Sequence, residues 1–270
     1  MSVLGLTSAK GAPGVTTTCV ALTLVWPRPL LLVEADPAGG DLLAGYLAGA
    51  EPPGGGLLGL ALAARRRPLE TDAVLEAAML LDTEGRRRVL VAPTDTGQSQ
   101  PIADAADRLA AAIGRLSEAR PDLDVIVDLG RVRDPVSTPW LRQLTALLLL
   151  TPPTLRGASS ARSVLGWLPG PTRDGCEIGL LLAGDGPYRQ AEMSDALGVS
   201  VVGTIAHDPP AAKALTGESP AGRGFDRSPL IRSARSLADS LTRAPAPSPG
   251  GTAQIAVETS AASVVVGEPA

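Results

Sequence analysis

The stretch "SAKGAPGVTTTCVAL", residues 8–22, contains the side chains best suited to chemistry. Glycines and hydroxyl groups ahead of a helix are typical of a phosphate loop, in which successive backbone N–H groups point at an anion. The usual pattern, G-x-x-x-x-G-K-[ST], adds a lysine for the terminal phosphates and a hydroxyl for magnesium. Gly14 and Thr16 match it, whereas Ala9 and Val15 replace the first glycine and the lysine. We interpret the stretch as a phosphate loop without its usual lysine.

The neighbouring sequence supports this interpretation. The loop follows the apolar segment "SVLGLTS" and precedes "TTTCVALTLVW", which has a helical pattern. A strand, a loop and a helix in this order are the context that the motif requires. Lys10 is one of two lysines in a chain with 24 basic residues, so a compact ammonium group is retained at this point of the loop.

Two carboxylates downstream are candidates for a metal site. Asp36 follows the apolar segment "PLLLVE", and Asp128 ends the apolar segment "LDVIVD". Each of them alone is equally well explained as a strand-end carboxylate that faces solvent and caps a loop. As a pair that follows two buried strands, with the phosphate loop upstream, they are predicted to surround a magnesium ion.

The elements that must position these residues alternate along the chain. Short apolar runs separated by longer helical stretches predict an α/β fold with a mostly parallel, twisted sheet and helices on both faces. The expected strands are residues 3–7, 29–33, 89–92, 124–128, 145–151, 178–183 and 199–205. The expected helices are residues 16–25, 57–64, 103–119, 159–168, 190–197 and 228–241. This domain should span residues 1–243, followed by a flexible Pro-, Ser-, Gly- and Ala-rich tail at 244–270.

Composition argues against several classes of function. The net charge of −4 gives no global basic field, so contact with nucleic acid would depend on the arginine runs at 65–67 and 86–88. Cys19 and Cys176 lie far apart without further Cys or His residues nearby, which argues against a disulfide framework or a zinc site. No apolar run reaches the roughly 18 residues of a spanning helix. We expect a cytoplasmic protein.

The loop resembles the deviant Walker A motif, K-G-G-x-G-K-T-T, of the MinD/ParA class of P-loop ATPases. Lys10, Gly11, Gly14, Thr16 and Thr17 match it. The resemblance implies a three-layer α/β/α domain that binds ATP with Mg²⁺. It gives Lys10 the role of the signature lysine, which crosses a dimer interface to the nucleotide of the partner subunit. It also implies that Gly14 lets the backbone approach the phosphates, that Thr16 binds magnesium and that Thr17 lies near the α-phosphate.

Three further segments resemble the same class, so the resemblance covers most of the expected domain. "PLLLVEADPAGGDL" is similar to its second strand and switch I, where Asp36 matches the acid that orients the attacking water or holds the metal shell. "LDVIVDLGRV" is similar to the Walker B strand and switch II, with Asp128 as a magnesium ligand through water. "LGVSVVGTIAHDPPAAKAL" is similar to the late strand and to the turn whose backbone packs on adenine, here Asp208 and Pro209.

The resemblance therefore implies three overlapping sets of site residues. The catalytic pair is Lys10 and Asp36. Magnesium is expected at Thr16, Asp36 and, through water, Asp128. The nucleotide-binding set consists of Lys10, Gly11, Ala12, Pro13, Gly14, Val15, Thr16, Thr17, Asp208 and Pro209.

The chain departs from the class at the loop and at the base. Pro13 removes one N–H donor from the loop. Val15 removes the lysine contact to the β- and γ-phosphates, and a charge-assisted contact of this kind is worth about 1.5–3 kcal/mol. Hydrolysis should suffer more than binding, because that lysine also stabilises charge on the transferring phosphoryl group, although Lys10 of a second copy can replace part of it. Ala183 and Gly184 stand where the class often has an asparagine that binds adenine, so adenine specificity is implied by the resemblance alone.

These features predict a degenerate ATP-binding protein that acts as a nucleotide-dependent or frozen homodimer, with weak or lost ATPase activity. Its expected role is positional or assembly regulation with a protein partner, in pilus or secretion machinery, where the CpaE/TadZ subgroup offers an analogy, or in cell division. Direct membrane binding is not expected, because Arg243 is the last basic residue and no basic amphipathic helix follows it.

Two other functions are compatible with the sequence. One is a competent ParA-type ATPase that partitions chromosomes or plasmids, with Lys10 in place of the missing lysine and DNA contact through the arginine runs. The other is a pseudo-ATPase scaffold that binds no nucleotide and holds a partner through residues 51–85 or the tail. Unchanged partner binding and stability in the Lys10→Ala and Thr16→Ala variants would favour the scaffold.

Overall fold

The described residues form one sheet with helices packed against both of its faces. The structure is a computed structural model of the 270-residue chain, and it describes residues 3–10, 14–132, 136–168, 170 and 172–243. The expected tail at 244–270 and three expected loop residues, Gly11, Ala12 and Pro13, lie outside the described residues.

The sheet has eight strands within the described residues. In chain order they are β1 (Val3–Ser8), β2 (Leu30–Glu34), β3 (Met79–Leu80), β4 (Arg87–Leu90), β5 (Asp124–Arg131), β6 (Ala146–Thr151), β7 (Glu177–Ala183) and β8 (Val201–Ile205). Across the sheet the order is β3-β4-β2-β5-β1-β6-β7-β8, and every neighbouring pair is parallel except β3 and β4. The expected mostly parallel α/β fold is confirmed. The unexpected strand, β3, is too short for a two-residue alternation to show in the sequence.

The helices largely follow the sequence pattern. The α-helices are α1 (Val15–Val25), α2 (Gly56–Ala64), α3 (Thr71–Glu76), α4 (Ser99–Asp104), α5 (Ala106–Ala119), α6 (Thr138–Leu141), α7 (Leu155–Leu165), α8 (Gln190–Leu197), α9 (Pro209–Leu215) and α10 (Pro229–Arg243). Three 3₁₀ turns, η1 (Pro53–Gly55), η2 (Thr96–Gln98) and η3 (Phe225–Arg227), complete the described elements. None of these helices combines the length and the apolarity needed to cross a bilayer.

Two expected helices need correction. The helix expected at 103–119 is two helices, because Ala105 has φ −100° and ψ 2° and interrupts the helical geometry between α4 and α5. The helix expected at 159–168 is α7, which begins earlier, at Leu155. The Thr154 side chain caps its N-terminus by accepting a hydrogen bond from the Gly157 N–H at 3.1 Å. The short helices α3, α6 and α9 were not expected.

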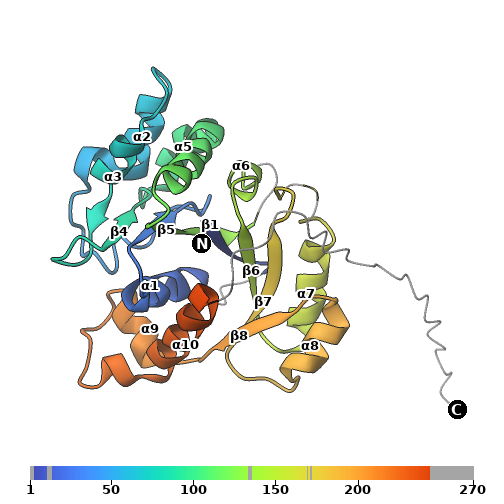
Figure 1. The fold of residues 1–270 in the computed structure, drawn as a ribbon. Coiled ribbons are helices and arrows are strands. Elements are labelled where there is room, and N and C mark those ends of the chain that lie inside the picture. Colours follow the sequence, from blue (N-terminus) through green and yellow to red (C-terminus); the bar gives the residue numbers. More distant parts are fainter. Residues whose placement is uncertain (1–2, 11–13, 133–135, 169, 171, 244–270) are drawn as a thin grey trace, which may run out of the picture.

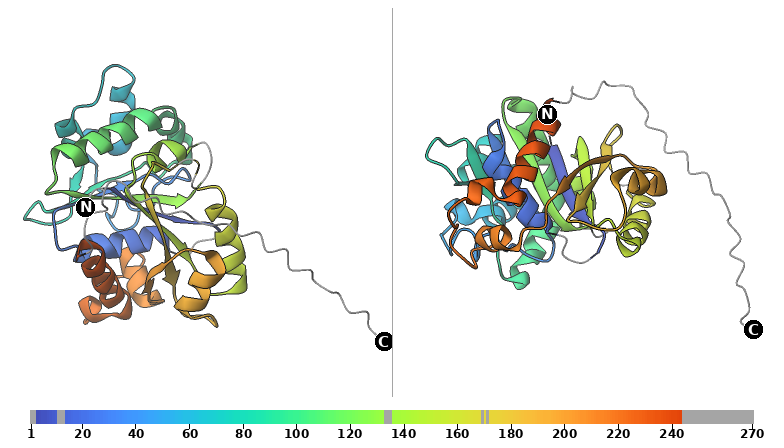
Figure 2. Two further views of the ribbon diagram at one scale, coloured as in Figure 1. Left: turned by 45° about the vertical axis from the view of Figure 1, so that its right-hand side comes forward. Right: turned by 90° about the horizontal axis from the view of Figure 1, so that it is seen from below.

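Side chains of the strands point alternately into two apolar cores. Val125 and Val127 of β5 belong to the core that α2, α3 and α5 cover, whereas Ile126 between them belongs to the core that α1, α9 and α10 cover (Figure 1). The two further views show the same layers, with α7 and α8 beside β7 and β8 (Figure 2). Burial on both faces explains why the strands are apolar along their whole length.

The carboxyl ends of the parallel strands meet at one edge of the sheet. β1 lies between β5 and β6, and the chain after β1 continues to β2, on the far side of β5. The strands β6, β7 and β8 extend the sheet in the other direction, so the strand order reverses at β1. Ligands of open α/β sheets bind at such a switch point, outside the carboxyl ends of the strands. At this point β1 ends and α1 begins.

Candidate functional site

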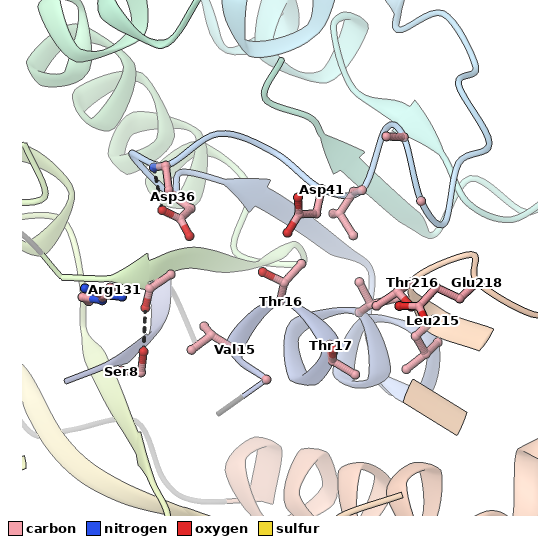
Figure 3. A pocket seen from close by; sticks show the side chains of 17 residues that line it. Ser8, Val15, Thr16, Thr17, Asp36, Asp41, Arg131, Leu215, Thr216 and Glu218 are labelled. Carbon is pink, nitrogen blue, oxygen red and sulfur yellow. Dashed lines mark hydrogen bonds between the residues drawn. The ribbon is translucent and has the colours of Figure 1, made fainter. Parts of the chain in front are cut away.

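A cavity of about 580 Å³ opens at the carboxyl ends of β1, β2 and β5, beside the first turn of α1 (Figure 3). Ser8, Asp36 and Arg131 lie at one end of this cavity, and Thr216 and Glu218 lie at the other. The expected phosphate loop contributes its described C-terminal part, Gly14 to Thr17, to the wall between the two ends. We call this space the first cavity.

Gly14 sets the backbone at the start of α1. Its φ of 85° and ψ of 42° are left-handed values that a side chain would strain. Its carbonyl accepts hydrogen bonds from the Thr18 N–H at 2.9 Å and from the Thr18 hydroxyl at 2.7 Å. The first N–H groups of an α-helix have no partner within the helix, and the described first turn of α1 contains no acidic residue. The charge of this helix start therefore favours an anion.

Val15 occupies the position of the usual lysine, and its side chain is 6% exposed. It belongs to the apolar core on the α1 face of the sheet, together with Cys19 and Leu22 of the same helix, while it also borders the first cavity. The first turn of α1 therefore offers hydroxyl groups, from Thr16 and Thr17, but no cation.

Asp128 is fully buried in β5, between Glu34 of β2 and Leu6 of β1 in the sheet register. Its Oδ1 accepts a hydrogen bond from the Gly130 N–H at 2.9 Å, but its Oδ2 has no partner among the described residues. Burial raises the pKa of this carboxyl to about 6, and the Thr16 side chain beside it lowers the pKa in part. A buried carboxylate oxygen without a partner, beside a hydroxyl, fits a cation bound through water.

Asp36 follows β2 and lines the first cavity. Its Oδ1 accepts a hydrogen bond from the Ala38 N–H at 2.7 Å. Its carboxyl group packs against the Cα of Gly130, which has φ +54° and leaves no room for a side chain. The charges of Asp36 and Asp41 both raise the pKa of Asp128. The end of β2 and the end of β5 thus bring three carboxylates into one electrostatic field.

The donor set suits magnesium better than a metal held by protein alone. Among the residues that the structure describes, no three His, Cys, Asp or Glu side chains are grouped to hold a metal ion. Magnesium is usually bound by one or two carboxylates together with water and phosphate oxygens. Thr16, Asp36 and Asp128 fit this pattern once a phosphate is present.

Glu34, at the end of β2, ties the following loop to the sheet. Its side chain is 1% exposed. Oε1 accepts hydrogen bonds from the N–H groups of Asp41 at 2.8 Å and Leu42 at 3.0 Å, and Oε2 accepts one from Ala92 at 3.0 Å. Burial raises the pKa of Glu34 to about 7, although these three bonds favour the ionised form. Glu34 therefore holds the loop that carries Asp36 and Asp41 into the cavity.

The stability of the nucleotide-free protein is expected to fall as the pH rises from about 4.5 to about 7, because of Glu34. The pKa of this group is about 7 in the folded state and near 4.5 unfolded, so the native state keeps a proton that the unfolded state has released. A pKa difference of this size corresponds to roughly 3 kcal/mol. Urea unfolding in EDTA across this pH range measures the slope, which should be smaller in Glu34→Gln. Equal slopes in the two proteins would contradict the assignment.

A second cavity, of about 490 Å³, adjoins the first at Gly14 and Thr17, which line both. The exposed Lys10 borders the second cavity, and so do Asp208 and Pro209 at the start of α9. The two cavities therefore lie next to each other at the start of α1.

Asp208 shapes the wall of the second cavity. Its Oδ1 accepts a hydrogen bond from the Ala211 N–H at 3.2 Å, and its Oδ2 accepts one from the Leu230 N–H at 3.3 Å. This carboxylate joins the starts of α9 and α10. Ala183 and Gly184 border the same cavity from the end of β7, so the strand side offers backbone groups and a methyl group for contact with a base.

The structure brings the described candidate residues together. Gly14 to Thr17 and Asp36 line the first cavity, Lys10, Asp208 and Pro209 line the second, and Asp128 is buried beside the first-turn hydroxyl of Thr16. Sequence reasoning missed three charged residues of the first cavity, which are Asp41, Arg131 and Glu218. A usable signal existed for Arg131, because it directly follows the segment "DLG" at the end of β5.

The two arginine runs have different surroundings. In the run at 86–88, guanidinium groups donate hydrogen bonds to the backbone carbonyls of Pro27, Thr23 and Leu75. The run at 65–67, which follows α2, borders a hollow of about 460 Å³ that Arg108 and Arg115 of α5 also line. We call this space the arginine hollow. Of the two runs that the sequence offers as candidates for a basic patch, only the run at 65–67 has further arginines beside it in the part of the chain that the structure describes.

Comparisons with known proteins agree on the fold. The sequence matches no protein-family model, and a search of curated proteins finds no match. The cell division ATPase MinD of Pyrococcus furiosus has a similar structure, with a TM-score of 0.71 and 18% identity over 89% of this chain and 98% of that chain. For a ParA family ATPase of Chlorobium tepidum TLS the TM-score is 0.66, with 20% identity over 88% and 98%. The septum site-determining protein MinD of Pyrococcus horikoshii OT3, complexed with Mg-ADP, has a TM-score of 0.62 and 16% identity over 90% of this chain and 96% of that chain. The chain shares the fold of these ATPases.

Proposed function

We propose that this chain, built on the fold of the MinD/ParA-type P-loop ATPases, binds ATP with Mg²⁺ where its two cavities meet. One observation carries the proposal. Two adjoining cavities share Gly14 and Thr17 at the start of α1, where a left-handed glycine precedes N–H groups that have no partner within the helix. This arrangement suits a nucleotide, because its phosphates need a polar space at a helix start and its base needs a neighbouring space of its own.

The chain's own residues divide the work. Gly14 and the first-turn N–H groups of α1 hold the phosphates, since the helix start favours negative charge. Thr16 contributes a hydroxyl to the metal, and Asp128 contributes its unpartnered Oδ2 through water. The second cavity takes the base and ribose, against Asp208 and Pro209. Bound magnesium would neutralise phosphate charge and hold the phosphates in place.

Slow turnover follows from the same geometry. The side chain of Val15 packs in the core, so the α1 turn supplies no cation to stabilise a transferring phosphoryl group. Lys10 is exposed at the mouth of the second cavity, where a second copy of the chain can approach it. We therefore favour a homodimer in which nucleotide acts mainly as a structural switch, and in which Lys10 of one subunit serves the nucleotide of the other.

A switch that turns over slowly suits positional or assembly regulation. The protein would mark a place by changing its dimeric state with bound nucleotide and by recruiting a protein partner, in pilus or secretion machinery of the CpaE/TadZ kind or in cell division. A competent partitioning ATPase differs from this regulator in having turnover that Lys10→Ala or Asp36→Ala abolishes. A pseudo-ATPase scaffold differs from both in binding no nucleotide.

The arginine hollow favours a second candidate function, an ATPase that works on DNA. Five arginines, Arg65, Arg66, Arg67, Arg108 and Arg115, line this one hollow in a chain with a net charge of −4. Arginine contacts with DNA phosphates give binding that weakens steeply with salt. Duplex binding of this kind, lost when residues 65–67 are changed to alanine, would favour this candidate, and no binding at low salt would remove it.

Saturable binding of ATP in excess Mg²⁺ is expected by isothermal titration calorimetry, with affinity reduced roughly tenfold or more in Thr16→Ala because the metal loses a hydroxyl ligand. Thr23→Ala is the matched control. Thr23 lies on the same helix, and its hydroxyl donates to the Cys19 carbonyl at 2.7 Å, outside both cavities. Equal affinities in all three proteins would contradict the placement of the metal. No binding up to millimolar ATP would leave the nucleotide-free scaffold.

A further inference from the structure

The first cavity is strongly acidic for a phosphate site that lacks its lysine. Its described lining residues include three carboxylates, Asp36, Asp41 and Glu218, and one cationic side chain, Arg131. A polyphosphate entering this cavity would meet net negative charge, which magnesium offsets in part. The position and the partners of Arg131 therefore decide whether the chain itself supplies a counter-charge.

Arg131 is held at the edge of the phosphate loop. It is the last residue of β5, and its partner in the parallel register is Ser8, the last residue of β1. The backbone is tied to β1 on both sides of Arg131. The Thr7 hydroxyl donates to the Gly130 carbonyl at 3.1 Å and accepts from the Val132 N–H at 3.0 Å. The Cα of Arg131 therefore has a fixed place beside the start of the loop.

The Arg131 guanidinium is available for a ligand. Several other arginines are occupied: Arg28, Arg87 and Arg120, for example, form ion pairs with carboxylates. The side chain of Arg131 is exposed, and none of the residues that the structure describes forms an ion pair or a hydrogen bond with its guanidinium. It lies at the Ser8 and Asp36 end of the first cavity, away from Glu218 (Figure 3).

We propose that Arg131 binds the terminal phosphate of the nucleotide and replaces the lysine that Val15 has displaced; this rests on the proposed function above. A nucleotide with its base in the second cavity passes Gly14 and Thr17 and then enters the first cavity, so that its last phosphate comes nearest to Arg131. A guanidinium suits that phosphate because its planar donors can bind two oxygens at once. The cation comes from switch II in place of the loop, and it makes the site selective for a triphosphate.

The proposal predicts an effect that grows with the number of phosphates. Arg131→Ala should weaken binding of Mg-ATP by roughly 10- to 100-fold and binding of AMP by less than about threefold. Arg131→Lys should lie between, since an ammonium keeps the charge but loses the two-pronged contact. Arg156→Ala is the matched control, because Arg156 is exposed on α7 and lines neither cavity.

A double-mutant cycle with Val15→Lys tests the replacement itself. The restored lysine should increase the affinity for Mg-ATP. It should also reduce the loss of affinity caused by Arg131→Ala to less than about threefold, because the lysine can then contact the terminal phosphate in place of the arginine. Calorimetric titration and thermal unfolding of each variant give the affinities and show which proteins are folded. If Val15→Lys does not fold, the comparison of ATP with AMP in Arg131→Ala and Arg131→Lys decides alone.

The outcomes separate the two claims. If wild-type protein binds Mg-ATP and Arg131→Ala binds it equally well, the inference about Arg131 is wrong and the proposed function stands. If Arg131→Ala lowers the affinity for ATP and for AMP by the same factor, Arg131 maintains the shape of the site and does not contact the terminal phosphate. This result also overturns the inference. If wild-type protein binds neither nucleotide, the proposed function itself fails.

Discussion

Gly14→Val is expected to abolish measurable binding of Mg-ATP, by a factor of at least about 100, while the fold remains intact. Gly14 has φ 85°, a left-handed value that a β-branched residue avoids. The neighbourhood is not crowded, since a Cβ built on Gly14 would meet Thr17 at an ordinary 3.8 Å. The variant should therefore relieve its strain by turning the loop backbone, which removes N–H groups from the phosphates, and the core should be spared.

Gly198→Val is the matched control for this prediction. Gly198 also has a left-handed φ, of 66°, at the C-terminus of α8, and a Cβ there would meet nothing within 4 Å. Both variants should lower the free energy of unfolding by a similar amount, on the order of 1–2 kcal/mol or more for the left-handed conformation. Calorimetric titration should find ATP binding lost in Gly14→Val and retained in Gly198→Val. Retention in both would remove Gly14 from the phosphate site.

The strands could be predicted because burial on both faces of a sheet requires a continuous run of apolar residues, which is visible in the sequence. Residues 30–33, "LLLV", and residues 125–127, "VIV", are apolar at every position, and each run lies in an interior strand of the sheet. The break at Ala105 has no comparable signal in the sequence, because alanine is a good helix former and neither glycine nor proline stands between α4 and α5. The antiparallel strand β3, with two residues, exists through its pairing with β4.

The candidate site was predictable where its residues lie in motifs. Gly14 and Thr16 lie at the start of α1, Asp36 follows β2, and Asp128 lies in the C-terminal half of β5, so their convergence at one edge follows from a parallel sheet. Charged residues such as Glu218 reach the cavity through a loop far along the chain, and no spacing in the sequence encodes that approach. The role of Glu34 as an anchor of the loop could not be predicted either, because the three N–H groups that donate to it come close to it only when the chain is folded.

Those three bonds make Glu34→Leu the most destabilising single change that we predict at the site. Leucine has a similar size, but it offers no acceptor to the buried N–H groups of Asp41, Leu42 and Ala92. Each buried donor left without a partner costs roughly 1–3 kcal/mol, so the free energy of unfolding should fall by about 3–5 kcal/mol unless the loop moves out. Chemical denaturation measures this loss.

Nucleotide binding should follow the loop. If residues 36–42 detach from the sheet in Glu34→Leu, Asp36 and Asp41 leave the first cavity, and Mg-ATP should bind more weakly even at temperatures where the protein is folded. Glu34→Gln keeps one carbonyl oxygen of the right length, so it should recover part of both the stability and the affinity. An equal loss in the two variants would mean that the charge of Glu34 matters, and not the loop anchorage that its hydrogen bonds provide.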